Sequence, residues 1–76
     1  MEVSMDKLPK LVPGVVTKIT CKDALTKRLR DFGLVPGTVV MNRYRSPDGG
    51  VTAFECRGAV LALRTKDLKG VRVKWG

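Results

Sequence analysis

The chain has 76 residues, of which 43% are hydrophobic and 29% are charged. This length allows one domain with a small core and argues against an enzyme whose large cavity is walled by two lobes. Fifteen Lys and Arg residues against seven Asp and Glu give a net charge of +8, which attracts nucleic acid, anionic lipid or an acidic protein face. Because no apolar run approaches the roughly 20 residues that cross a bilayer and no signal peptide is evident, we expect a cytoplasmic protein without membrane insertion.

The first part of the chain is predicted to enter a β-structure through a turn. We expect residues 1–7 to be a flexible lead-in and residues 8–76 to form a single domain. The sequence Val-Pro-Gly-Val at 12–15 predicts a type II turn, because proline presets φ and glycine accepts a positive φ. The β-branched run at 15–20 then predicts a strand.

One helix is predicted after this strand. Leu25, Leu29 and Phe32 repeat at helical spacing, and Gly33 suits the left-handed residue that ends a helix. These residues predict an α-helix at about 23–32.

The remainder of the chain is predicted to be mainly β. The sequence Leu-Val-Pro-Gly at 34–37 repeats that at 11–14, and each copy precedes a β-branched run. The dense turn cluster Ser-Pro-Asp-Gly-Gly at 46–50 predicts a hairpin between strands at 38–45 and 51–57.

The last segments complete a count of five short strands. Residues 59–64 are apolar on both faces, which predicts a strand at the centre of the barrel. A short helical turn at about 65–69 and an alternating strand at 71–75 follow. Five strands in so short a chain favour a small, strongly bent barrel with one inserted helix. Its predicted core contains Leu25, Leu29, Phe32, Phe54, Leu61, Leu63, Val71, Val73 and Trp75.

The residues that enzymes and metal sites use are scarce. The chain has no histidine, no glycine-rich phosphate loop and no cluster of carboxylates on one element, so we expect no catalytic activity. Cys21 and Cys56 are the remaining candidate metal ligands, and we interpret them as reduced thiols. Two thiols without histidine cannot complete a four-ligand zinc site in one chain, so we expect no bound metal or cofactor.

The segment Lys-Arg-Leu-Arg-Asp-Phe-Gly-Leu-Val-Pro-Gly-Thr at 27–38 resembles the FeoA family of ferrous iron transport proteins. The likeness extends over about residues 8–74, through the 11–14 turn, Pro47 before its glycine pair, and the strand at 58–64. It implies an SH3-like barrel with a helical insertion, a fold that also occurs as an appended domain of iron-dependent repressors. It further implies an accessory role for the membrane ferrous transporter FeoB, and it leaves Fe²⁺ as a candidate ligand.

Two functions are consistent with these features. In the first, the protein is a non-catalytic interaction module that docks on the cytosolic part of FeoB, as a monomer or weak homodimer. The expected docking face contains Lys27, Arg28 and Arg30 on the helix, with Arg64 nearby. In the alternative, a basic SH3-like barrel binds RNA, for which Tyr44 between two arginines is the local indication.

Overall fold

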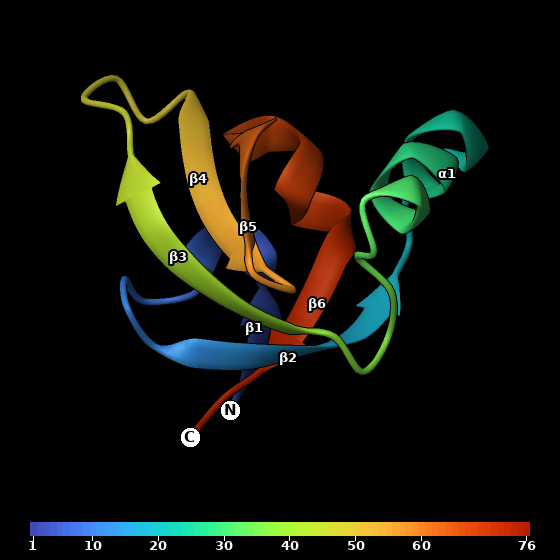
Figure 1. Cartoon of the computed structure of the whole chain (residues 1–76), viewed down its shortest axis with the longest axis horizontal. Coiled ribbons are helices and arrows are strands. Elements are labelled where there is room, and N and C mark those ends of the chain that lie inside the picture. The colour runs from blue at the N-terminus through green and yellow to red at the C-terminus, as the bar shows by residue number, and fades with distance from the viewer.

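The computed structural model describes all 76 residues and shows a mainly β fold (Figure 1). Six strands form one sheet in the order β1-β6-β2-β3-β4-β5, and every neighbouring pair is antiparallel. One α-helix and two 3-10 helices (η) complete it. In chain order the elements are β1 (Glu2–Ser4), η1 (Met5–Lys7), β2 (Pro13–Ile19), α1 (Asp23–Asp31), β3 (Val39–Arg45), β4 (Val51–Cys56), β5 (Ala59–Arg64), η2 (Thr65–Gly70) and β6 (Val71–Lys74).

Two β-bulges bend this sheet into a barrel. One lies in the pairing of β2 with β6, between Val16 and Lys18, and the other in the pairing of β3 with β4, between Asn42 and Tyr44. An extra residue on one strand kinks that strand and increases its twist, so the sheet curls around its inner face. β2 can therefore pair with β3 at its beginning and with β6 along the rest of its length, as its curved path in Figure 1 shows.

The domain begins earlier than predicted, because residues 1–7 lie in the fold and are not a lead-in outside it. β1 pairs with β6 from Glu2 opposite Lys74 to Ser4 opposite Arg72, and this pairing adds a sixth strand to the predicted five. Met5 in η1 is completely buried. Three residues of strand and one helical turn are too short to show a period, so the sequence pattern could not reveal them.

The two Leu-Val-Pro-Gly segments adopt different conformations. The second forms a type II turn, the conformation that was predicted for the first: Gly37 has φ 94°, and the Thr38 amide donates to the Val35 carbonyl at 3.0 Å. The first does not, because Gly14 lies within β2 and has no positive φ. A Cβ at Gly14 would lie 3.1 Å from both methyl groups of Leu8, so this glycine permits close packing instead of a turn.

Helix α1 ends as the sequence predicts. The Leu34 amide donates to the Leu29 carbonyl at 2.9 Å, the Gly33 amide donates to the Arg30 carbonyl at 2.8 Å, and Gly33 has φ 88°. These bonds form a Schellman motif. Leu29 is the only fully buried side chain of the helix, so α1 contacts the barrel along a narrow stripe.

The core lies on the concave side of the sheet. In β4 the buried Thr52, Phe54 and Cys56 alternate with more exposed residues, as a strand with one face on a core requires. The predicted core residues Leu29, Phe54, Val71 and Val73 are fully buried, and Leu25, Leu61, Leu63 and Trp75 pack against the core while partly exposed.

Phe32 is the predicted core residue that lies outside the core. Its side chain is 45% exposed, because it follows the last residue of α1 and lies beyond the stripe on which Leu29 is buried.

The strand predicted at the barrel centre lies at the sheet edge. β5 pairs with β4 and with no other strand, and Val60 on its outer face is 61% exposed. Its apolar residues on both faces therefore reflect partial burial on one face and an exposed surface on the other. No helix of the structure is both long and apolar enough to span a membrane.

Candidate docking groove

A groove separates α1 from the segment formed by β5 and η2. Its larger section has a volume of about 500 Å³, and a narrower section of about 210 Å³ continues from it. Leu25, Arg28, Arg64 and Asp67 line both sections, so the two form one continuous feature, which we call the α1–β5 groove. In Figure 1, β4 lies on one side of β5 and α1 on the other.

Five of the eight residues that line the narrower section are apolar. Leu25, Leu29 and Phe32 come from the helix side, and Ala62 and Leu63 come from β5. Because α1 buries only Leu29 completely, the remaining apolar atoms of its inner face are left beside the groove. The result is an apolar wall beside the charged groups of Arg28, Arg64 and Asp67, a combination that is typical of binding pockets.

The floor of the larger section is held by contacts between the end of β2 and η2. The Thr20 amide donates to the Gly70 carbonyl at 2.7 Å, and the Thr20 hydroxyl donates to the same oxygen at 3.1 Å. The Cys21 thiol lies close to Gly70 on this floor. Two donors on one carbonyl fix the separation of these segments, so the shape of the groove is preformed.

The groove is strongly basic. Lys22, Arg28, Arg64 and Lys66 line it, and Asp67 is its only acidic residue. None of these five residues takes part in an ion pair. The two ion pairs of the molecule lie elsewhere, Arg43–Glu55 at 3.4 Å and Arg72–Glu2 at 3.7 Å. The cations of the groove are therefore free to bind an external anion.

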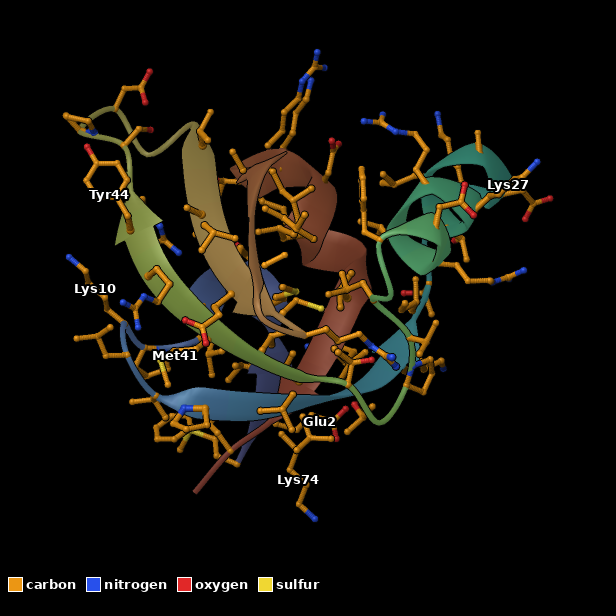
Figure 2. The ribbon with its side chains drawn as sticks, in the orientation of Figure 1. Glu2, Lys10, Lys27, Met41, Tyr44 and Lys74 are labelled. Carbon is orange, nitrogen blue, oxygen red and sulfur yellow. The ribbon has the colours of Figure 1, made fainter.

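The structure divides the four predicted docking cations into two pairs. Arg28 and Arg64 line the α1–β5 groove from opposite sides. Lys27 and Arg30 do not line it, because at about 100° per residue they stand about 200° and 140° around the helix axis from Leu25. In Figure 2 the Lys27 side chain points away from the barrel.

The two cysteines lie in different parts of the molecule, and of the metal-ligating side chains only that of Asp67 influences Cys21. Cys21 is partly buried at the groove, and Cys56 is buried in β4. Burial raises the pKa of both thiols, the charge of Asp67 raises that of Cys21 further, and Arg57 lowers that of Cys56 in part. No three residues among His, Cys, Asp and Glu gather to hold a metal ion. The donor set of this chain therefore does not fit a resident transition metal.

A second basic surface lies across the molecule from α1, around Tyr44 (Figure 2). Tyr44 is 54% exposed, and the Lys10 Nζ lies 6.0 Å from the centroid of its ring. The flanking arginines are engaged within the protein, because Arg43 pairs with Glu55 and Arg45 donates to the Asp6 carbonyl and the Thr52 hydroxyl. This surface therefore offers one exposed ring with one free cation beside it.

Sequence reasoning missed several side chains of the groove, among them Lys22, Lys66 and Phe32. The helical spacing that assigned Phe32 to the core also places it beside Leu25 on the groove face, and spacing alone cannot separate these two outcomes. Lys22 precedes the predicted helix and Lys66 lies in the predicted helical turn at 65–69, where a charge usually indicates solvent exposure. Only the packing of η2 against the end of β2 brings them together.

The fold and the groove define a small SH3-like barrel domain with an inserted helix and a basic cleft. A family model described as FeoA domain matches residues 3–74, so the chain belongs to the FeoA family, which is associated with ferrous iron transport. This confirms the family and the fold class that the sequence predicts. No curated protein matches the chain.

Solved structures agree with this assignment. The solution structure of FeoA from Chlorobium tepidum is 26% identical with a TM-score of 0.90, covering 96% of this chain and 70% of that one. FeoA from Stenotrophomonas maltophilia, complexed with zinc and described as a prokaryotic SH3 domain protein, is 29% identical with a TM-score of 0.79, covering 97% and 89%. T. acidophilum IdeR, at 16% identity, shares the fold alone; its TM-score is 0.86, with 99% of this chain and 34% of that chain covered.

Proposed function

We propose that this protein is a non-catalytic, cytoplasmic interaction module of ferrous iron uptake that docks on the cytosolic part of the transporter FeoB. The observation that carries the proposal is the α1–β5 groove, with four unpaired cations beside an apolar wall in a FeoA domain. Such a surface can bind a protein face through both apolar contact and charge. No group of three or more His, Cys, Asp or Glu side chains forms a competing metal site in the chain.

The four basic residues predicted for docking provide a matched test. The variant Arg28→Glu/Arg64→Glu reverses two charges in the groove, and Lys27→Glu/Arg30→Glu reverses two on the far side of α1. Both lower the net charge equally, so a general electrostatic attraction would weaken equally in both. We place the contact in the groove and expect the first pair to weaken docking by at least about tenfold, and the second by less than about threefold.

The measurement is a titration of the ¹⁵N-labelled protein with the soluble cytosolic domain of the transporter at physiological salt. Localised shifts at groove residues, which persist when salt is raised, are the expected result. Equal losses in the two double variants would place the contact outside the groove. The absence of any shift with the transporter domain would contradict docking on this part of FeoB.

RNA binding is the second candidate, and the pairing of Lys10 with the exposed ring of Tyr44 favours it. An exposed ring beside a cation can stack on an unpaired base. Such binding would fall steeply with salt and would depend on Tyr44, so Tyr44→Ala would abolish it while leaving the groove intact. Salt-sensitive shifts centred on Tyr44 with a structured RNA, together with none at the groove, would favour this function over the first.

A further inference from the structure

The outer edge of β5 has main-chain groups without partners. β5 is the last strand of the sheet, and in an antiparallel pair alternate residues direct their N–H and C=O groups to the neighbouring strand. The Thr65 amide donates to the Gly50 carbonyl at 3.0 Å, at the end of the pairing between β4 and β5. Since every second residue bonds to the same neighbour, Leu63 and Leu61 also direct their main-chain groups to β4. The N–H and C=O groups of Val60 and Ala62 therefore point away from β4.

This free edge borders the α1–β5 groove. Ala62, Leu63 and Arg64 line its narrower section opposite α1, and no hydrogen bond connects α1 to the edge. An unpaired edge usually needs protection against association with other chains. Here the helix leaves a preformed slot beside the edge instead of covering it, so an extended segment can reach these main-chain groups.

The charge of the slot determines which segment fits. Arg64 and Lys66 lie at the end of β5, and Lys22 and Arg28 lie on the helix side. Asp67 is the only acidic residue among them. A basic or neutral segment would leave these cations without counter-charges, whereas carboxylates would pair with them. The apolar wall near Phe32, which is 45% exposed, favours apolar residues between the acidic ones.

We infer that the α1–β5 groove binds an extended acidic segment of a partner protein, which adds a strand to the edge of β5. Main-chain bonds to Val60 and Ala62 hold the segment, and its alternating side chains divide between the cations and the apolar wall. This inference rests on the proposed docking function for the identity of the partner, because the segment would then belong to the cytosolic part of the transporter. The chemistry of the groove can be tested without the transporter.

The probe is a capped peptide of about seven residues with alternating Glu and Val, the length of an ordinary strand. A peptide with Lys in place of Glu is its control. We expect shifts of the ¹⁵N-labelled protein along β5 and α1 with the acidic peptide and none with the basic one. With the peptide at about ten times its Kd, exchange of the Val60 and Ala62 amides should slow about tenfold, while that of Leu61 and Leu63 should not change.

Two N-methylated peptides separate main-chain pairing from simple charge attraction. One carries methyl groups on the amides of its Glu residues, and the other on the amides of its Val residues. Since only alternate residues of an added strand bond to β5, one peptide should lose binding and the other should retain it. Retention by both, or loss by both, would overturn strand addition, as would shifts confined to Arg28 and Arg64 without protection of Val60.

Variants of the protein complete the test. Arg28→Glu/Arg64→Glu should weaken the acidic peptide at least about tenfold, and Lys27→Glu/Arg30→Glu should not. The spectrum of each free variant shows whether it remains folded. If the acidic peptide fails to bind the unmodified protein, the inference is wrong even where the transporter domain docks. If the peptide binds and the transporter domain does not, the proposed partner is wrong and the groove chemistry stands.

Discussion

The Sγ atom of Cys21 lies 2.7 Å from the position that a Cβ on Gly70 would occupy. The Thr20 carbonyl oxygen lies 2.9 Å from the same position, and both are closer than real Cβ atoms approach their neighbours. Only glycine therefore allows η2 to press against the end of β2. This contact forms the floor of the α1–β5 groove, so the shape of the groove depends on one missing methyl group.

Replacing Gly70 by Ala should destabilise the protein by about 1–3 kcal/mol, since the new methyl group meets main-chain atoms that cannot rotate away. Urea denaturation gives the free energy of unfolding. Gly50→Ala is the control, because a Cβ there meets only the side chain of Asp48, at 3.3 Å. Equal losses in the two variants would show that the loss of glycine itself, and not the contact with Thr20 and Cys21, is responsible.

The N-terminal turn should contribute strongly to stability. Met5 is completely buried and belongs to the core, so Met5→Ala should cost about 2–5 kcal/mol in the free energy of unfolding. Met1→Ala serves as a control, because Met1 is 73% exposed. Thermal denaturation followed by circular dichroism measures both. A Met5 variant as stable as the parent would mean that residues 1–7 lie outside the cooperative fold.

The two phenylalanines should differ in the same assay. Phe54→Ala removes a fully buried ring and should cost about 3–5 kcal/mol. Phe32→Ala removes a half-exposed ring beside the groove and should cost less than about 1.5 kcal/mol. Because Phe32→Ala should remain folded, it can also show whether the apolar wall contributes to binding. A large loss of stability in this variant would place the ring in the core.

The thiols should react slowly near neutral pH. Burial raises the pKa of Cys21, the charge of Asp67 raises it further, and a thiol with a raised pKa forms little of the reactive thiolate. Alkylation by iodoacetamide, followed by mass spectrometry of peptides, should therefore increase only above the ordinary thiol range. Asp67→Asn should shift the Cys21 profile to lower pH and leave that of Cys56 in place. An unchanged Cys21 profile would show that Asp67 does not influence this thiol.

The raised pKa values of the two thiols imply that the folded protein loses stability at alkaline pH. The folded protein holds its thiol protons more tightly than the unfolded chain, so folding is favoured fully below the unfolded pKa of about 8.5. The contribution is lost as pH rises through the raised folded values. Replacing Cys56, which is buried, by Ala should flatten this alkaline decline in urea midpoints recorded across the range.

Local signals predicted most of the fold. Gly33 and Gly37 have the positive φ values that their turn chemistry requires, and the hairpin of β3 and β4 follows from its glycine-rich turn. The predictions that were wrong depended on tertiary context. Gly14 looks like Gly37 in its sequence, yet it lies in β2 because the side chain of Leu8 needs the space. The place of β5 at the sheet edge depends on which strands close the barrel, and no residue within it reports that.

The candidate site was predicted only in part, for the same reason. Charge and the FeoA resemblance selected Arg28 and Arg64, which the structure brings to one groove. They also selected Lys27 and Arg30, because the sequence does not show which side of α1 faces the barrel. A helix that buries only one residue, as α1 buries Leu29, has too few apolar positions for its pattern to show which side is buried.

The two ends of the chain are side by side, and this determines how the domain responds to tension. The Met1 amino group donates to the Trp75 carbonyl at 2.7 Å, and the Trp75 amide donates to the Met1 carbonyl at 2.8 Å. Both ends leave the barrel at the same place in Figure 1. A force applied between them would open β1 from β6 one hydrogen bond at a time, starting with the Trp75 pair, instead of shearing all of them together. The N-terminal strand would therefore detach at a low force, before the rest of the barrel unfolds.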